Sequence, residues 1–128
     1  MTADAAPDNI PKPAPKIDDR KEPRLPVSWR GQVALPNGMK DNVRIRDISE
    51  SGLGMVAPNP VPNNSVVTIS MGVPDLTDPA RTVTVTGKLR VAFVVIQGHD
   101  YRIGGQWSDI PPAMREMLKQ IIKRHRFG

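Results

Sequence analysis

The sequence predicts an all-β fold, a six-stranded antiparallel β-barrel followed by one amphipathic α-helix. Apolar and polar residues alternate in short runs between Pro26 and Trp107, as they do in strands with one buried face. Turns rich in proline, glycine and asparagine separate the runs, and no helical period lies between them. These observations predict a barrel over about residues 26–107 and a helix over about residues 111–126.

The first four strands follow from local alternation and from the turns between them. Residues 27–35 and 42–46 alternate on either side of residues 36–38, a Pro-Asn-Gly turn in which asparagine and glycine tolerate positive φ. The third strand is expected at residues 53–56. A proline-rich loop then leads to the fourth strand, which is expected at residues 66–71.

Residues 82–96 form the longest alternating run and predict the fifth strand. Gly87 interrupts this run and predicts a bend or a bulge, as closed barrels need. A turn at residues 97–100 leads into the sixth strand at residues 101–107. One face of the fifth strand is expected to carry the apolar side chains of Val83, Val85, Leu89, Val91, Phe93 and Val95.

After Trp107 the apolar residues recur with the period of an amphipathic helix. Asp109 is expected to cap its N-terminus, and Pro111 and Pro112 suit its first turn. The basic residues near the C-terminus match the helix dipole. The apolar stripe is expected to close one end of the barrel, and it consists of Met114, Met117, Leu118, Ile121 and Ile122.

The N-terminal segment differs in composition from the rest of the chain. Residues 1–19 are rich in proline, alanine and charge and cannot build a core. They predict a disordered N-terminal arm, followed by a single domain over residues 20–128.

Composition narrows the function classes. None of the 128 residues is a cysteine, which excludes thiolate metal sites. The formal net charge of +5 favours an anionic partner. No apolar run is long enough for a membrane span, and neither histidine has the neighbours of a metal site. No nucleophile with a base and no carboxylate pair is recognisable. The sequence therefore predicts a cytoplasmic protein that is not an enzyme, without a metal or another cofactor and without membrane insertion.

Two short motifs carry the functional signal. Arg20 and Arg24 precede the first strand, and Asp47, Ser49 and Gly52 lie between the second and third strands. A guanidinium group can grip a phosphate or the O6 and N7 atoms of guanine, and a carboxylate complements guanine N1–H and N2–H. A serine hydroxyl supports a phosphate or a turn, and glycine lets a backbone approach a ligand. Each piece alone is typical of an ordinary turn or charged segment, but together they suit a planar, phosphorylated ligand.

This arrangement resembles the PilZ domain, the bacterial receptor module for cyclic di-GMP, whose signature is R-x-x-x-R followed by (D/N)-x-S-x-x-G. The resemblance extends from Arg20 to the chain end and includes a closing strand at residues 101–107. It implies cyclic di-GMP as the ligand, with Arg20 and Arg24 gripping guanine and phosphate and Asp47 accepting from a guanine edge. It also implies that Ser49 supports the phosphate or the turn and that Gly52 keeps the turn open.

The resemblance further implies a switch, in which the ligand orders the arginine arm and the signal passes to a protein partner. Asp19, an acid directly before the first arginine, leaves open whether one or two ligand molecules bind. Arg46, Arg90 and Gly105 are candidate auxiliary contacts, although exposed strand arginines and a barrel kink are the simpler explanations.

Two other function classes stay open at this point. A PilZ-like scaffold for pilus or secretion assembly, without nucleotide binding, is the main alternative. Barrels that bind nucleic acid usually stack bases on several aromatic side chains, and this chain has few, so no DNA or RNA partner is expected. Motility, exopolysaccharide secretion and pilus function are equally open as the regulated process.

Overall fold

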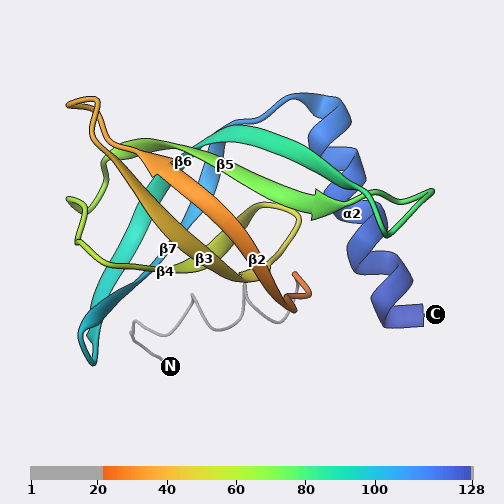
Figure 1. Ribbon diagram of the computed structural model, residues 1–128, viewed down its shortest axis with the longest axis horizontal. Helices are drawn as coiled ribbons and strands as arrows, with labels where there is room; N and C mark the ends of the chain where they lie inside the picture. Colours follow the sequence, from red (N-terminus) through yellow and green to blue (C-terminus); the bar gives the residue numbers. More distant parts are fainter. Residues whose placement is uncertain (1–21, 128) are drawn as a thin grey trace, which may run out of the picture.

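The computed structural model describes residues 22–127, so the predicted arm and the motif residue Arg20 lie outside the described residues. Within them, six antiparallel strands close into a barrel in the order β2-β3-β4-β7-β6-β5, and one helix follows (Figure 1). This confirms the predicted fold class. The elements are β2 (Leu25–Ala34), β3 (Lys40–Ile48), β4 (Gly52–Ala57), β5 (Val66–Pro74), β6 (Thr82–Gln97), β7 (Asp100–Asp109) and α2 (Pro112–Phe127).

The core fills the barrel, because along most of the strand length every second side chain points inward. In β5 the buried residues are Val67, Ile69, Met71 and Val73, and their neighbours along the strand are half-buried. Burying an aliphatic side chain of this size contributes about 1.5–3 kcal/mol. The alternation that predicts the strands is therefore also the pattern that stabilises them.

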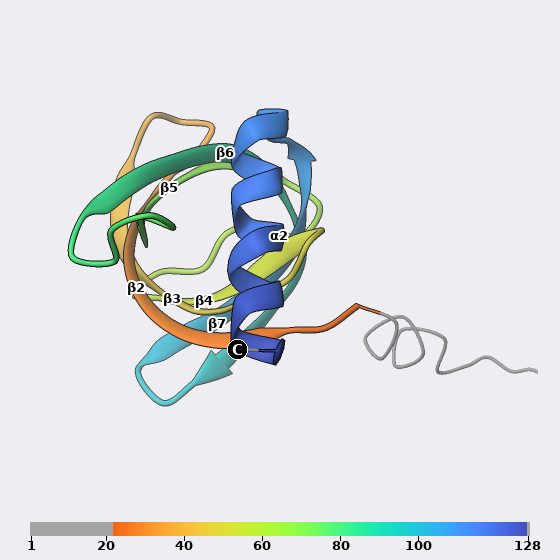
Figure 2. The same ribbon diagram turned by 90° about the vertical axis from the view of Figure 1, so that its right-hand side faces the viewer.

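Helix α2 lies across one end of the barrel, as predicted (Figure 2). Its side chains Leu118, Ile121 and Ile122 are buried within the core cluster. The barrel end is thus closed by an apolar stripe, while the β6–β7 hairpin projects from the opposite end (Figure 1).

The expected inward face of β6 is wrong for its last part. The register shifts between Val91 and Phe93, so one extra residue of β6 bulges out of the ladder with β7. A shift by one residue moves the following side chains to the other face. Phe93 and Val95 are therefore 41% and 54% exposed, and Val94 packs against the core in their place.

The bulge predicted at Gly87 is not found there, because β6 keeps an unbroken register with β5 through this residue. The nearby shift in the ladder with β7, between Lys88 and Leu89, places the extra residue in β7. A Cβ atom at Gly87 would lie 2.9 Å from the indole ring of Trp107. Glycine at this position therefore lets the aromatic ring pack against the β6 backbone.

Candidate functional site

Asp47 lies on the outer face of the barrel near the end of β3, where the register shifts between Ile45 and Asp47. Its partner across the ladder is Gly54 of β4. A Cβ atom at Gly54 would lie 2.8 Å from Oδ2 of Asp47. The bulge and the missing side chain together make room for this carboxylate to lie over the neighbouring strand.

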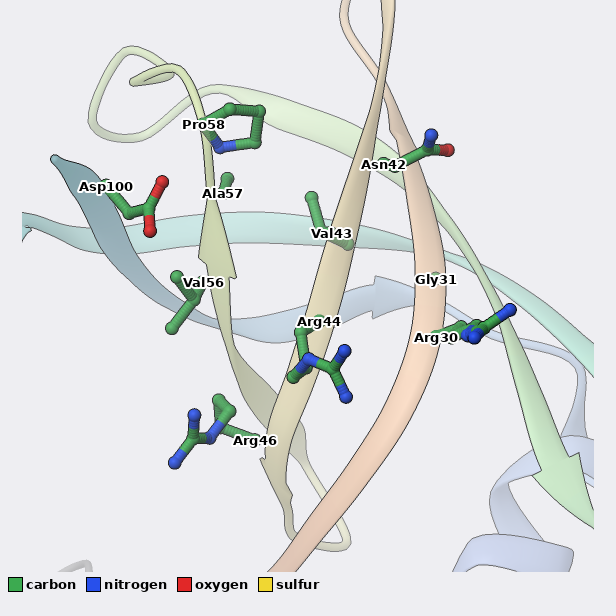
Figure 3. A pocket seen from close by; sticks show the side chains of 10 residues that line it. All are labelled: Arg30, Gly31, Asn42, Val43, Arg44, Arg46, Val56, Ala57, Pro58 and Asp100. Carbon is green, nitrogen blue, oxygen red and sulfur yellow. The ribbon is translucent and has the colours of Figure 1, made fainter.

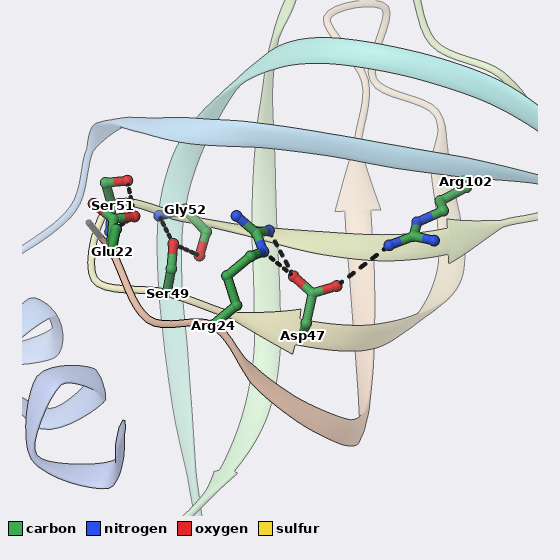
Figure 4. A network of polar contacts seen from close by, with 7 residues as sticks. All are labelled: Glu22, Arg24, Asp47, Ser49, Ser51, Gly52 and Arg102. Carbon is green, nitrogen blue, oxygen red and sulfur yellow. Dashed lines mark hydrogen bonds and ion pairs between the residues drawn. The ribbon is translucent and has the colours of Figure 1, made fainter. Parts of the chain in front are cut away.

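Two guanidinium groups flank the Asp47 carboxylate (Figure 4). Arg24 donates to Oδ1 through Nε at 3.1 Å and through Nη2 at 2.6 Å. On the other side, Nη2 of Arg102 lies 3.8 Å from Oδ2. The side chain of Asp47 is only 14% exposed, whereas those of Arg24 and Arg102 are 38% and 53% exposed. Asp47 and Arg24, the motif acid and the second motif arginine, therefore form an ion pair with each other. Arg102 also belongs to this site, and the sequence motifs did not indicate it.

Ser49 and Gly52 hold the turn between β3 and β4. The Ser49 side chain is fully buried, and its hydroxyl accepts from the Gly52 N–H at 3.2 Å and lies 3.3 Å from the Gly52 carbonyl. A Cβ atom at Gly52 would lie 2.0 Å from the carbonyl oxygen of Gly105. Both residues thus fix the turn against β7, and of the two roles considered for Ser49 the geometry favours support of the turn.

Glu22 fastens the segment before β2 to this turn. Its carboxylate accepts from both the hydroxyl and the backbone N–H of Ser51. Partial burial raises the pKa of Glu22, but hydrogen bonds from Ser51 and Ser49 and the charge of Arg24 outweigh it and lower the pKa below its ordinary value. Glu22 lies between the two motif arginines in sequence, so this clamp, Glu22 with Ser51, holds the residues just before Arg24 beside the turn.

The clamp predicts a pH-dependent contact. Because the folded-state pKa of Glu22 is lowered, its contribution is complete above the ordinary pKa and is lost as the pH falls below about 4.5 and through the lowered value. We expect Glu22→Gln to speed hydrogen exchange of the Ser51 amide at neutral pH and to remove the acid-dependent change. Glu50→Gln, at an exposed neighbouring acid, is the control and should change neither. Equal exchange rates in the wild type and Glu22→Gln would contradict the clamp.

Phe93 forms an exposed aromatic surface beside the Asp47 cluster, which we define as Asp47 with its two partners Arg24 and Arg102. Gly54 pairs with Gly104 of β7, and Gly104 pairs with Phe93 of β6, so Asp47 and the phenyl ring lie in one row across the barrel. A Cβ atom at Gly104 would lie 2.3 Å from the Phe93 ring. The two glycines leave the space that the carboxylate and the ring occupy. No local pattern predicts this surface, because the bulge in β6 creates it.

The three candidate auxiliary residues lie in different surroundings. Arg46 lines a hollow of about 200 Å³ together with Asp47 and Arg102. Arg90 directs its guanidinium toward the carbonyl of Asn64, at 3.3 Å. A Cβ atom at Gly105 would lie 2.2 Å from the Arg90 carbonyl, so Gly105 accommodates the backbone of β6. The structure brings only Arg46 close to the Asp47 cluster.

The cluster offers a carboxylate acceptor, two arginines and an exposed ring, a set that suits a base with a donor edge and an anionic group. Residues 22–127 contain no group of three or more potential metal ligands. In the same part of the chain, no helix is both long enough and apolar enough to cross a membrane.

Similar folds occur in solved structures, although the comparison with curated protein sequences finds no match. The Bacillus subtilis inhibitor of motility MotI/DgrA aligns with TM-score 0.73 and 14% identity, over 84% of this chain and 51% of that one. The PilZ domain of Escherichia coli YcgR with c-di-GMP aligns with TM-score 0.60 and 16% identity, over 84% and 94%. MrkH of K. pneumoniae, a c-di-GMP-dependent transcription regulatory factor, aligns with TM-score 0.64 and 15% identity, over 84% and 51%.

The chain spans about half the length of MotI and MrkH and nearly all of the YcgR domain. At these identities the structural likeness concerns the fold. The comparison with protein families adds a match to the PilZ domain over residues 18–124. That match covers both motifs, all six strands and most of the helix. The chain therefore belongs to the PilZ domain family.

Proposed function

We propose that this chain is a receptor for cyclic di-GMP. The observation that carries the proposal is the Asp47 carboxylate held between Arg24 and Arg102, beside the exposed ring of Phe93. PilZ proteins are receptors and effectors of cyclic di-GMP and are not enzymes, and the YcgR domain described above has c-di-GMP bound.

Each group has a role in this proposal. The Asp47 carboxylate accepts from N1–H and N2–H of a guanine. Arg24 leaves Asp47 and grips a phosphate or the O6 and N7 atoms of the base, because its planar fork fits either. Arg20 supplies a second guanidinium group from the arm, and the ring of Phe93 stacks on a base. Ser49 and Gly52 keep the turn in place beneath them.

Ligand binding acts as a switch in this account. The ion pair between Arg24 and Asp47 is exchanged for contacts with the nucleotide, and Arg20 is drawn toward the barrel. The clamp between Glu22 and Ser51 keeps the arm attached near the turn during the exchange. The ordered arm then presents a new surface to a protein partner in the cytoplasm. Motility is one candidate process, because MotI is an inhibitor of motility.

The test of this proposal is a thermal shift measurement with a panel of nucleotides. A ligand at a hundred times its Kd stabilises the folded state by about 2.7 kcal/mol. We expect cyclic di-GMP to raise the Tm of the full chain by several degrees, and GTP and cyclic di-AMP to leave it unchanged. Equal shifts with all three would mean a general anion site. A DNA duplex belongs in the panel because MrkH is a transcription regulatory factor.

The role of Phe93 in stacking on a guanine base of the ligand can be tested separately. Stacking of a base on an aromatic side chain contributes about 1–3 kcal/mol. We expect Phe93→Ala to weaken cyclic di-GMP binding by roughly tenfold or more. Phe93→Tyr keeps the ring and should bind normally. Because the side chain is 41% exposed, the alanine variant should unfold at nearly the wild-type temperature. Unchanged affinity in Phe93→Ala would exclude stacking at this position.

A further inference from the structure

A second surface, the arginine groove, lies on the outer face of the barrel (Figure 3). We define it as the groove of about 790 Å³ that is lined by Arg30 of β2 and by Arg44 and Arg46 of β3. Asp100, at the start of β7, lies on the far side of the groove across β4 (Figure 3). The groove borders the Asp47 cluster through Arg46, but Arg30 and Arg44 are not part of that cluster.

The arrangement of the groove places like charges side by side. Arg30 and Arg44 are direct partners in the β2–β3 ladder, and both are exposed. Directly opposed residues have Cβ atoms about 4.5–5.5 Å apart, and like charges at that separation are destabilising. Arg44 donates to the Ser28 hydroxyl at 2.9 Å, which does not neutralise it. No carboxylate of residues 22–127 forms an ion pair with Arg30, Arg44 or Arg46. An anionic partner would offset this repulsion.

The remaining lining residues indicate what kind of partner fits. Val56 of β4, which is half-buried, and Pro58 of the following loop, which is exposed, give the groove an apolar side. Asp100 places a negative charge beyond that side, where the evenly spaced phosphates of a nucleic acid would be repelled. A protein segment can instead carry its carboxylates at one end and apolar side chains at the other.

We infer that the arginine groove docks a segment of a partner protein in which acidic residues are followed by apolar ones. The carboxylates would lie over Arg30, Arg44 and Arg46, and the apolar residues over Val56 and Pro58. This inference goes beyond the proposed receptor function, because it concerns a different surface and needs no nucleotide.

The test is an NMR titration of the ¹⁵N-labelled full chain, without nucleotide, with a synthetic peptide of four glutamates followed by leucine, alanine and proline. We expect the peptide to shift the backbone signals of Gly31, Val43 and Val56, which line the groove. Binding should weaken as salt rises, because exposed charges are screened. A peptide with lysines in place of the glutamates should not bind, and neither should a single-stranded DNA octanucleotide.

Matched charge-removal variants separate this groove from basic surface in general. Two exposed ion pairs contribute up to about 1 kcal/mol each, so Arg30→Ser with Arg44→Ser should weaken peptide binding by about tenfold. Arg81→Ser with Lys88→Ser removes the same charge from exposed positions away from the groove and should leave binding within about twofold. The groove variant should keep or raise its Tm, since it removes a like-charge pair.

Three results would overturn the inference. One is the absence of groove shifts at millimolar peptide, and another is an equal loss of binding in both double variants. The third is binding of the DNA octanucleotide in the groove as tight as that of the peptide. Cyclic di-GMP titrations of the same variants keep this inference distinct from the receptor proposal. Lost nucleotide binding in the Arg30 and Arg44 variant would be a fourth result against the inference, because it would assign the groove to the nucleotide site.

Discussion

Arg24→Ala is expected to weaken cyclic di-GMP binding by about tenfold to a hundredfold, so that none is detected at micromolar ligand. The hydrogen bonds that a charged group makes with a ligand contribute about 1.5–3 kcal/mol, which corresponds to that range. The folded state should change little, because the ion pair of Arg24 with Asp47 is partly exposed and such pairs contribute about 0–1 kcal/mol. Isothermal titration measures the affinity, and thermal unfolding measures the stability.

The control for Arg24→Ala is Arg81→Ala, which removes an exposed arginine from the loop between β5 and β6. It should bind cyclic di-GMP as the wild type does, since it changes the net charge equally but not the site. Arg20→Ala should weaken cyclic di-GMP binding as much as Arg24→Ala does if the arm supplies the second guanidinium group. Wild-type affinity in Arg24→Ala would remove the arginine motif from the account.

Gly52→Ala is expected to lower stability by about 3 kcal/mol and to abolish binding in the fraction that folds. The new methyl group would lie 2.0 Å from the Gly105 carbonyl and 3.0 Å from Cα of Gln106, both backbone atoms of β7. Relieving the overlap requires β4 and β7 to separate, which moves the turn that holds Asp47. For a domain of this size the loss corresponds to a fall in Tm of about 10 °C or more.

A second glycine variant separates steric overlap from backbone conformation. Gly98 has φ of +63° at the tip of the β6–β7 hairpin, and nothing lies within 4 Å of a Cβ atom there. Gly98→Ala should therefore cost only the strain of the left-handed conformation, about 1–2 kcal/mol, and should leave nucleotide binding intact. If the Tm of Gly52→Ala is no lower than that of Gly98→Ala, the turn does not approach β7 as closely as described.

Much of the fold could be predicted because its signals are local. Strand alternation, the turn glycines and prolines and the helical period after Trp107 each depend on neighbouring residues. The burial of Leu118, Ile121 and Ile122 against the barrel follows from the same periodicity. The last part of β6 could not be predicted in this way. A bulge after Val91 moves the following side chains to the opposite face, and the alternating sequence of β6 does not reveal it.

The site could be predicted only in part, because its missing members come from distant segments. Arg102 reaches Asp47 through the register of β4 with β7, which alternation does not specify. Glu22 and Ser51 are 29 positions apart, and their hydrogen bond depends on how the chain enters β2. The roles of Ser49 and Gly52 likewise depend on β7, against which the turn packs.

The most direct test of the central claim is an isothermal titration of the full chain with cyclic di-GMP at moderate salt. We predict binding at micromolar Kd or tighter, absent with GTP and cyclic di-AMP, and the molar ratio will distinguish one bound molecule from two. The absence of heat together with the absence of a thermal shift at high ligand concentration would contradict the account. The pairing of Arg24 with Asp47 would then be a structural feature of a protein-binding scaffold.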